Sequence, residues 1–193
     1  MSQVSFENRT VIVTGAGNGL GKAYALDLGL RGAKVVVNDL GGAVDGSGSG
    51  STPADEVVKE IIANGGEAVA NYDSVATKEG GESIVQTAID NFGTVDAVVN
   101  NAGILRDKSF ANMSEEELSL VIDVHLKGTF FVSQPAFKVM KENAYGRIVN
   151  VASPSGLFGN FGQSNYGAAK MGIVGLTNVL AIEGAKYNIK VNV

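Results

Sequence analysis

The chain has 193 residues, a formal net charge of −5, no cysteine and one histidine. Its length supports one domain with a sizeable core. The composition excludes a disulfide framework and a thiolate nucleophile, and one histidine cannot by itself anchor a zinc site, so we predict no metal. No basic run is present, which argues against a nucleic-acid partner. No apolar run reaches membrane-spanning length and the first residues lack a signal-peptide core, so we expect no membrane association and an intracellular, reducing compartment.

Short β-branched runs alternate with helix-sized stretches along the chain. Most of these runs are continuously apolar, which is typical of strands buried on both faces of a parallel sheet. The alternation predicts an α/β fold with a doubly wound parallel sheet in three αβα layers. The strands are expected at Thr10–Thr14, Lys34–Asn38, Glu67–Asn71, Ala97–Asn100, Arg147–Val151 and Ile189–Val193.

Two of the predicted helices carry start signals. Thr52 is expected to be an N-cap, because Pro53 follows it at the first helical position and Asp55 lies at the third. Ser114–Glu117 has the sequence of a capping box, and its acids suit the positive end of a helix. The glycine- and serine-rich segment Gly41–Ser51 is expected to be a flexible surface loop. Its position after the second strand would place it near a bound adenosine.

The sequence ends at Lys190–Val193, inside the last predicted strand. A strand of such a sheet needs cover on both faces. We therefore expect residues 1–193 to be a single nucleotide-binding domain, truncated after its sixth strand.

A glycine-rich turn, Thr14–Gly21, follows the first strand. Such a turn lets the backbone approach a pyrophosphate closely, and the next helix offers free N–H groups and a positive dipole. The pattern is T-G-x-x-x-G-x-G, with Leu20 where a G-x-G-x-x-G fingerprint has its third glycine. The alternative interpretation is a tight strand-to-helix turn without a ligand.

Asp39 ends the second predicted strand, close to the spacing expected for an acid that binds ribose hydroxyls. Its carboxylate would repel a 2′-phosphate, which favours NAD over NADP. A simple turn aspartate is the alternative. Polar residues also end the third and fourth strands, in Asn71–Val75 and Asn100–Gly103. Carboxyl ends of strands border the ligand crevice of this fold, so these segments are placed to meet adenine and ribose.

Tyr166 and Lys170 are four residues apart with only small residues between them. On a helix, such positions share one face. A nearby cation favours the charged form of a phenol and so makes it a better proton carrier near neutral pH. Pairs of this kind are also common on solvated helices, so the pair alone is weak evidence.

Taken together, these motifs resemble the short-chain dehydrogenase/reductase family, in the family's order and over nearly the whole chain. The matching residues are Thr14–Gly21, Asp39, Asn100–Gly103, Ser153, Tyr166 and Lys170. The resemblance implies that Tyr166 is the general acid or base, that Lys170 assists it and holds the nicotinamide ribose, and that Ser153 binds the substrate oxygen. The cofactor contacts that it implies are Gly15, Asn18, Gly19, Leu20, Gly21, Asp39, Asp73, Ser74, Val75, Asn101, Ala102, Gly103, Tyr166 and Lys170.

Further segments look like the (3R)-hydroxyacyl-CoA dehydrogenases that occur in peroxisomal multifunctional enzymes of type 2 and as free-standing bacterial proteins. These segments are Val37–Gly42, Ala70–Val75, Gly103–Asp107 and Gly159–Gln163. The resemblance implies an NAD-dependent oxidoreductase of acyl-CoA thioesters, in the cytoplasm or, in a eukaryote, the peroxisomal matrix. Two alternatives remain: the same reaction on a carrier-protein thioester, steroid or polyol, and a dinucleotide-binding sensor without chemistry.

Two residues near the expected site need separate comment. His125 stands where many members of the family carry an asparagine that belongs to a proton relay. We expect a buried histidine bonded to the backbone, with a supporting role near the site as the alternative. Pro154 directly follows Ser153 and biases that serine toward an extended conformation.

The segment Ala168–Ile182 is apolar on almost every side, and Leu118–Phe137 carries a similar surplus. A helix that is apolar all round must be covered on both faces. We expect both segments to pack against second copies in a homodimer or homotetramer, with Gly172 and Gly175 allowing close approach. The alternative is a core completed by further residues of the same domain.

Overall fold

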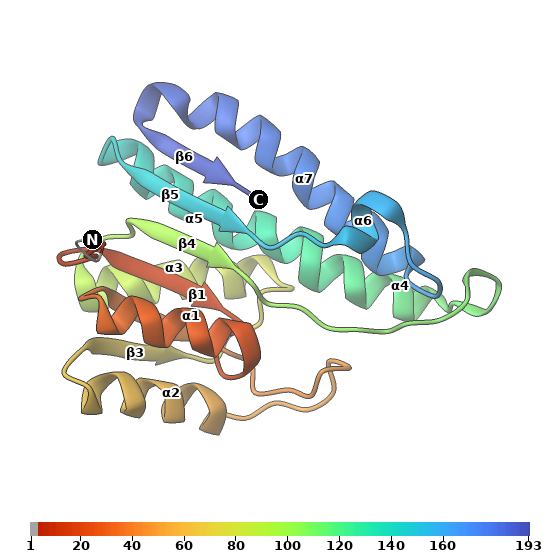
Figure 1. Cartoon of the computed structure of the whole chain (residues 1–193), viewed down its shortest axis with the longest axis horizontal. Coiled ribbons are helices and arrows are strands. Elements are labelled where there is room, and N and C mark those ends of the chain that lie inside the picture. Colours follow the sequence, from red (N-terminus) through yellow and green to blue (C-terminus); the bar gives the residue numbers. More distant parts are fainter. Residues whose placement is uncertain (1–3) are drawn as a thin grey trace.

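The computed structural model describes residues 4–193 and contains one six-stranded sheet, in which every neighbouring pair is parallel (Figure 1). The strand order is β3-β2-β1-β4-β5-β6, which is that of a doubly wound dinucleotide-binding fold. The predicted fold class is therefore confirmed. The strands are β1 (Thr10–Thr14), β2 (Lys34–Asn38), β3 (Glu67–Asn71), β4 (Ala97–Asn100), β5 (Gly146–Asn150) and β6 (Ile189–Asn192).

Four strands have the predicted bounds, whereas β5 lies one residue earlier than expected and β6 stops before Val193. The difference at β5 is small, because the Val151 N–H still donates to Asn100 O at 3.1 Å. Beyond that bond the chain leaves the sheet toward the next helix. Strand ends of this kind differ by a residue according to where pairing is judged to stop.

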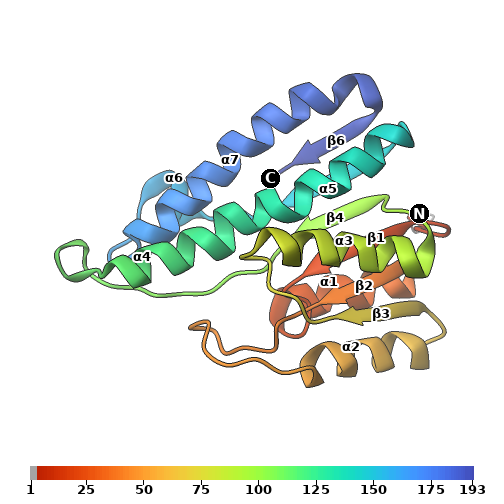
Figure 2. The same cartoon turned by 180° about the vertical axis from the view of Figure 1, so that it is seen from behind.

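Helices cover the sheet in two layers (Figures 1 and 2). Helices α1 and α2 lie on one face, and α3, α5 and α7 pack on the other. The helices are α1 (Gly19–Leu30), α2 (Thr52–Ala63), α3 (Lys78–Phe92), α4 (Glu115–Ile122), α5 (Gly128–Glu142), α6 (Pro154–Phe158) and α7 (Ser164–Gly184).

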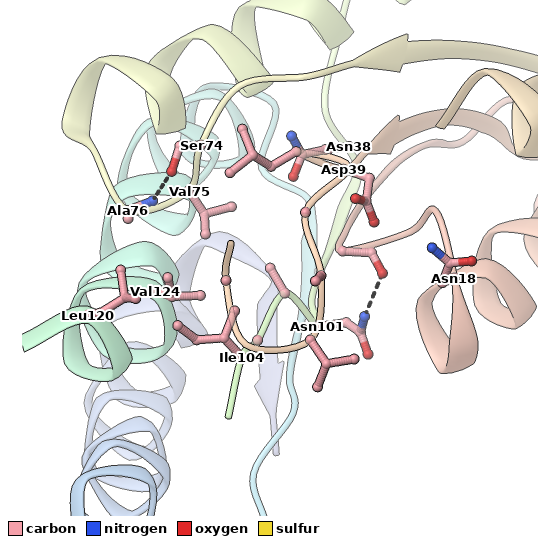
Figure 3. A pocket seen from close by; sticks show the side chains of 18 of the residues that line it. Asn18, Asn38, Asp39, Ser74, Val75, Ala76, Asn101, Ile104, Leu120 and Val124 are labelled. Carbon is pink, nitrogen blue, oxygen red and sulfur yellow. Dashed lines mark hydrogen bonds between the residues drawn. The ribbon is translucent and has the colours of Figure 1, made fainter. Parts of the chain in front are cut away.

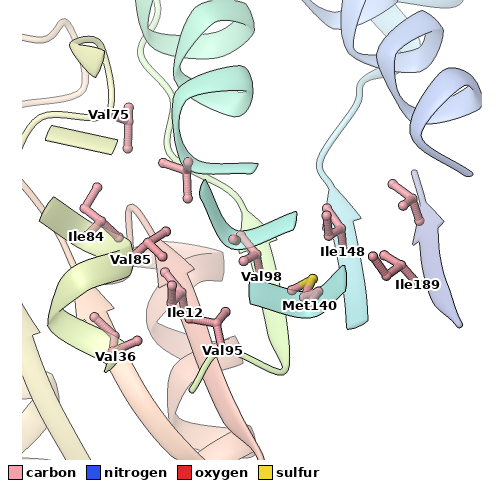
Figure 4. Packing of buried hydrophobic residues seen from close by; sticks show 14 residues of the cluster. Ile12, Val36, Val75, Ile84, Val85, Val95, Val98, Met140, Ile148 and Ile189 are labelled. Atoms are coloured by element: carbon pink, nitrogen blue, oxygen red, sulfur yellow. The ribbon is translucent and has the colours of Figure 1, made fainter. Parts of the chain in front are cut away.

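Alternate strand residues feed two separate cores, as the continuously apolar runs predict. Ile12, Val98 and Ile148 belong to the core beneath α3 and α5, where Met140 is also fully buried (Figure 4). The opposite side chains of β1 and β2 form a second core with α1 and α2; its members include Val11, Val13, Val35, Val37, Val57 and Ile61.

On the face of the sheet that α1 and α2 cover, one part has no covering helix among residues 4–193. Val149 pairs with Val99, whose side chain belongs to the core under α1 and α2. Val149 therefore points to the same face, but it is 43% exposed. An apolar strand residue that remains open in this way marks an exposed apolar patch on this face of the sheet.

The predicted helix starts have mixed outcomes. The capping box at Ser114 is present: Ser114 Oγ accepts the Glu117 N–H, and the Glu117 carboxylate accepts the Ser114 N–H. The predicted N-cap at Thr52 is wrong, because Thr52 is already helical and Ser51 precedes the helix. The shift places Pro53 in the first turn, where its missing N–H removes no helical hydrogen bond.

Helices α4 and α5 are joined by a π-helical turn at Asp123–Lys127, which keeps the two helices continuous. Turns of this type insert one extra residue into the helix and are frequent at functional sites. Here the turn carries His125, whose side chain is buried. No pattern in the sequence predicts this irregularity.

Candidate active site

A cavity of about 380 Å³ opens at the carboxyl ends of β1 to β4 (Figure 3). This is the edge of the sheet at which doubly wound folds bind their ligands. Ten of the residues that the sequence predicts as cofactor contacts line the cavity: Gly15, Asn18, Gly19, Asp39, Asp73, Ser74, Val75, Asn101, Ala102 and Gly103. Leu20, Gly21, Tyr166 and Lys170 do not belong to its wall.

The glycine-rich turn is built by close backbone packing. Gly15 has a φ of +61°, and a Cβ on it would lie 2.7 Å from Ala102 Cα. A Cβ on Gly21 would lie 2.1 Å from Gly15 O, so this glycine is required for packing although it does not line the cavity. Asn101 Nδ2 donates to Thr14 O and Gly15 O at 3.1 and 3.0 Å. The side chain of Leu20 is 63% exposed.

The start of α1 faces this turn without a capping side chain. Asn18 stands at the N-cap but makes no side-chain hydrogen bond to the helix, and the first turn contains no acidic residue. The unpaired N–H groups and the positive end of the helix dipole therefore stay available to an anion. Asn18 and Gly19 both line the cavity, so that anion would lie inside it.

Asp39 links the turn to the loop that follows β2. Its Oδ2 accepts the Gly17 N–H and its Oδ1 accepts the Gly41 N–H, each at 2.7 Å. Each carboxylate oxygen has lone pairs left for another donor. The acid is thus held in place at the cavity wall and can still accept hydrogen bonds from a ligand's hydroxyl groups.

The loop between β2 and α2 is not a free surface excursion, contrary to the expectation for Gly41–Ser51. Gly42, Ala43, Val44 and Gly46 line the cavity. The Leu105 N–H donates to Val44 O at 3.0 Å, and Arg106 Nε donates to Asp45 O. These bonds connect the loop to the chain beyond β4, so the loop forms one side of the site. The composition of the loop did not predict this role in the cavity wall, because the role depends on contacts with residues some 60 positions away.

Lys170 lies on α7, and its side chain is buried. Its Nζ donates to Val151 O at 2.5 Å, at the end of β5, and lies 5.5 Å from the centroid of the Tyr166 ring. Burial lowers the pKa of the Lys170 ammonium to about 8. The predicted pairing of a phenol and an ammonium on one helical face is therefore present, with the cation close to the ring.

Ser153 lies where β5 runs into α6. It has the extended conformation expected before proline, with φ −154° and ψ 146°, and its Oγ accepts the Ser155 N–H at 3.2 Å as the cap of α6. Helix α6 packs tightly on α7, since a Cβ on Gly156 would lie 2.9 Å from the backbone N of Met171. The structure thus gathers Ser153, Tyr166 and Lys170 at the junction of β5, α6 and α7.

His125 connects this junction to the cavity wall. Its Nε2 lies 2.8 Å from Ile104 O, and its ring meets the Tyr166 ring edge-on, with centroids 5.0 Å apart. Burial, reinforced by the Lys170 charge, lowers the pKa of the imidazole to about 4. The expectation of a buried histidine bonded to backbone is confirmed.

The cavity wall also includes residues that sequence reasoning missed. Asn38 precedes Asp39 and donates from Nδ2 to Asn71 Oδ1 and Asp73 O, both at 2.9 Å, so it ties the ends of β2 and β3 together. Asn38 could have been predicted as a site residue, because it is a polar residue at the end of an otherwise apolar strand. The positions of Ile104, Leu120 and Val124 in the cavity wall could not be predicted, because they depend on how distant segments of the chain fold together.

Among residues 4–193, no helix is both long enough and apolar enough to cross a membrane. The same residues contain no group of three or more metal-binding side chains. The fold, the uncapped helix start at a glycine-rich turn, and the acid at the end of β2 define a dinucleotide-binding α/β protein.

The family is more specific than that class. A family model described as short chain dehydrogenase matches residues 9–193, and the chain belongs to this family of oxidoreductases. It is 58% identical over 191 residues to peroxisomal multifunctional enzyme type 2 of Mus musculus, covering 99% of this chain and 26% of that protein. The resemblance predicted from the sequence motifs is thereby confirmed.

Two solved structures are similar over most of this chain. A short chain dehydrogenase from Mycobacterium avium has a TM-score of 0.90 and 49% identity, covering 96% of this chain and 66% of that one. An NAD⁺-bound xylitol dehydrogenase has a TM-score of 0.89 and 29% identity, covering 97% of this chain and 69% of that one. The chain spans about a quarter of the length of the mouse relative and about two thirds of the mycobacterial one.

Proposed function

We propose that the protein is an NAD-dependent dehydrogenase that interconverts a secondary alcohol and a ketone, with a (3R)-3-hydroxyacyl-CoA as the alcohol. The observation that carries the proposal is the position of the Tyr166–Lys170 pair. It lies against His125, whose other side contacts Ile104 in the wall of the nucleotide cavity. A proton-transferring phenol is thereby adjacent to a dinucleotide site.

The residues of the cavity suit a dinucleotide. The uncapped start of α1 offers N–H groups to a pyrophosphate, and the open side of Gly19, which has no heavy atom within 4 Å of an added Cβ, leaves room for it. Asp39 would accept hydrogen bonds from the ribose hydroxyls and repel a 2′-phosphate. The xylitol dehydrogenase relative was solved with NAD⁺ bound. These features support NAD as the cofactor.

Each catalytic residue then has a defined task. Tyr166 takes the hydroxyl proton in oxidation and returns it in reduction. The buried Lys170 ammonium, held by Val151 O, has N–H donors left for the nicotinamide ribose and supports negative charge on the phenol oxygen. Ser153, fixed at the start of α6, donates its hydroxyl proton to the substrate oxygen. Bound NAD supplies the acceptor for the hydride.

The substrate class follows from the motif resemblance to hydroxyacyl-CoA dehydrogenases together with the 58% identity to the mouse multifunctional enzyme. A polyol is the second candidate, because the xylitol dehydrogenase relative has the same fold at 29% identity. The exposed apolar patch at Val149 supports a domain that continues beyond these residues, as the expectation of a truncated domain requires.

The groove between α5 and α7 supports the predicted homodimer or homotetramer. Its volume is about 570 Å³, and its apolar walls include Leu126, Phe130, Leu176 and Val179. An added Cβ on Gly175 would meet no heavy atom within 4 Å, which leaves room for a second copy. Gly172 also lines the groove, but a Cβ added there would lie 3.0 Å from the Leu126 side chain of its own chain.

A coupled assay tests the proposed function. The full-length protein is mixed with NAD or NADP and with hydroxyacyl-CoA thioesters, free polyols or steroids, and the reduced cofactor is followed by absorbance. The proposal expects turnover with NAD and a (3R)-hydroxyacyl-CoA, and little with NADP. Turnover with NADP alone would overturn the reading of Asp39, and turnover of polyols alone would overturn the thioester assignment.

A further inference from the structure

His125, the one histidine of the chain, contacts two parts of the site that belong to different elements of the fold. Ile104 lies in the segment after β4 and lines the cavity, whereas Tyr166 lies on α7. His125 reaches both from the π-helical turn between α4 and α5. The bridge is buried, since the residue is only 3% exposed.

The ring also fills the space beside the cavity wall. A Cβ added to Gly103 would lie 2.4 Å from His125 Cε1 and 3.1 Å from Nδ1. The imidazole therefore lies directly on the Gly103 backbone. With the contact to Ile104, it fixes two consecutive residues that line the cavity.

The geometry favours one tautomer of the ring. Nε2 lies 2.8 Å from Ile104 O and 3.1 Å from Ile104 N, so it could donate to the carbonyl or accept from the amide. Nδ1 is buried and has no hydrogen-bond partner among residues 4–193. A proton on Nδ1 would thus bury an unpaired N–H, whereas a proton on Nε2 makes the shorter bond.

The surroundings of the ring also favour its neutral form. The ring is shielded from water, and the charged group that faces it is the Lys170 ammonium, which would repel an imidazolium. Tyr166 contacts it through the ring edge and offers no negative charge while protonated. His125 thus differs from a histidine that exchanges protons in the reaction.

From these contacts we propose that His125 is a positioning residue: a neutral, Nε2-protonated imidazole that locks the Gly103–Ile104 wall of the nucleotide cavity and braces the Tyr166 ring. The proposal rests on the proposed dehydrogenase function. Its two halves are separable, because the bond to Ile104 uses the ring nitrogen and the contact with Tyr166 uses the ring itself.

Two variants divide these contributions. H125F keeps a flat ring against Tyr166 but loses the donor to Ile104, and it should raise the Kd for NAD about tenfold while changing kcat less. H125Q keeps an N–H donor near the Nε2 position but loses the ring, and it should lower kcat about tenfold while changing the Kd for NAD less. The control is I84A, which removes buried volume from the core beneath α3 and α5.

The kinetic constants are compared per folded molecule, with the folded fraction of each variant measured by circular dichroism. The split between Kd and kcat supports the proposal. If H125F and H125Q behave like I84A, losing stability but keeping the wild-type Kd and kcat per folded molecule, the residue is merely structural and the proposal is overturned.

A spectroscopic test needs no turnover and so separates this proposal from the proposed function. The chain has a single histidine, so its imidazole ¹⁵N signals need no assignment. The proposal expects a neutral ring protonated on Nε2 at pH 7, with no titration down to pH ~5. A ring that titrates near the ordinary histidine pKa of about 6.5, or is protonated on Nδ1, would overturn it even in an active enzyme.

Discussion

Asp39 closes the glycine-rich turn, because its Oδ2 accepts the N–H of Gly17 at 2.7 Å. A Cβ on Gly17 would lie 2.8 Å from the Asp39 carboxylate, so a side chain at position 17 would collide with Asp39. The acid is therefore part of the architecture of the turn as well as a candidate ligand for ribose.

Substitution D39N tests this double role. The neutral amide no longer repels a 2′-phosphate, and its NH2 group presents two N–H donors where the carboxylate offered only acceptors. We expect the Kd for NAD to rise about tenfold or more and the preference for NAD over NADP to shrink, as measured by calorimetry with both dinucleotides. D45N is the matched control, because Asp45 lies in the same loop but outside the cavity wall. An unchanged NAD-to-NADP ratio in D39N would contradict the assignment.

The buried His125 predicts a loss of stability in mild acid. Its pKa is lowered to about 4 in the folded protein, against about 6.5 in the unfolded chain. The unfolded chain therefore binds the extra proton first, and stability falls as pH drops below about 6.5. Between pH 7 and 5 we expect the free energy of unfolding to fall by about 2 kcal/mol more in the wild type than in H125Q. Denaturant titrations of both proteins at pH 7 and pH 5 measure this difference. An equal fall in the free energy of unfolding in the wild type and in H125Q would refute it.

The packing of His125 on Gly103 predicts an energetic coupling between them. G103A alone should destabilise the protein by about 1–3 kcal/mol, because the new methyl group collides with the ring. In an H125A background the space is open, so the same change should cost at least about 1 kcal/mol less. Chemical denaturation of the four proteins completes the cycle.

G50A serves as the control for this cycle, because an added Cβ at Gly50 would meet no heavy atom within 4 Å. It should be close to neutral in either background. Additive effects of G103A and H125A would show that the ring does not occupy the space beside Gly103.

The groove between α5 and α7 predicts an oligomer that a single charge disrupts. Val179 lies in its wall and is 52% exposed. V179D should convert a dimer or tetramer into monomers in sedimentation at micromolar concentration, because a buried unpaired carboxylate is costly. I62D places the same charge on an exposed aliphatic position of α2, on the opposite layer, and should leave assembly intact. A wild-type full-length protein that sediments as a monomer would exclude the interface.

Features that depend on neighbouring residues alone could be predicted from the sequence. Val35, Val36 and Val37 are buried on alternate faces, as a continuous β-branched run requires, and the Ser114–Glu117 capping box formed as its spacing indicated. The glycine turn and Asp39 were found because their spacing reflects the reach of one strand–helix–strand unit.

Features that depend on distant contacts were not predictable in the same way. Ile104 and His125 are 21 residues apart and meet only through a π-helical turn that has no sequence signature. The loop Gly41–Ser51 appeared flexible by composition, yet its bonds to Leu105 and Arg106 hold it at the cavity. Helix α6 was missed because five residues are too few to show a helical period.

The most direct test of the account is the variant Y166F in the full-length protein. It removes one hydroxyl group and keeps the ring that contacts His125. We predict that NAD binds with nearly the wild-type Kd while hydride transfer from the alcohol substrate falls at least about a hundredfold, measured as single-turnover absorbance of the reduced cofactor. Turnover that survives the loss of this hydroxyl would contradict the assignment of Tyr166 as the proton carrier and, with it, the proposed reaction.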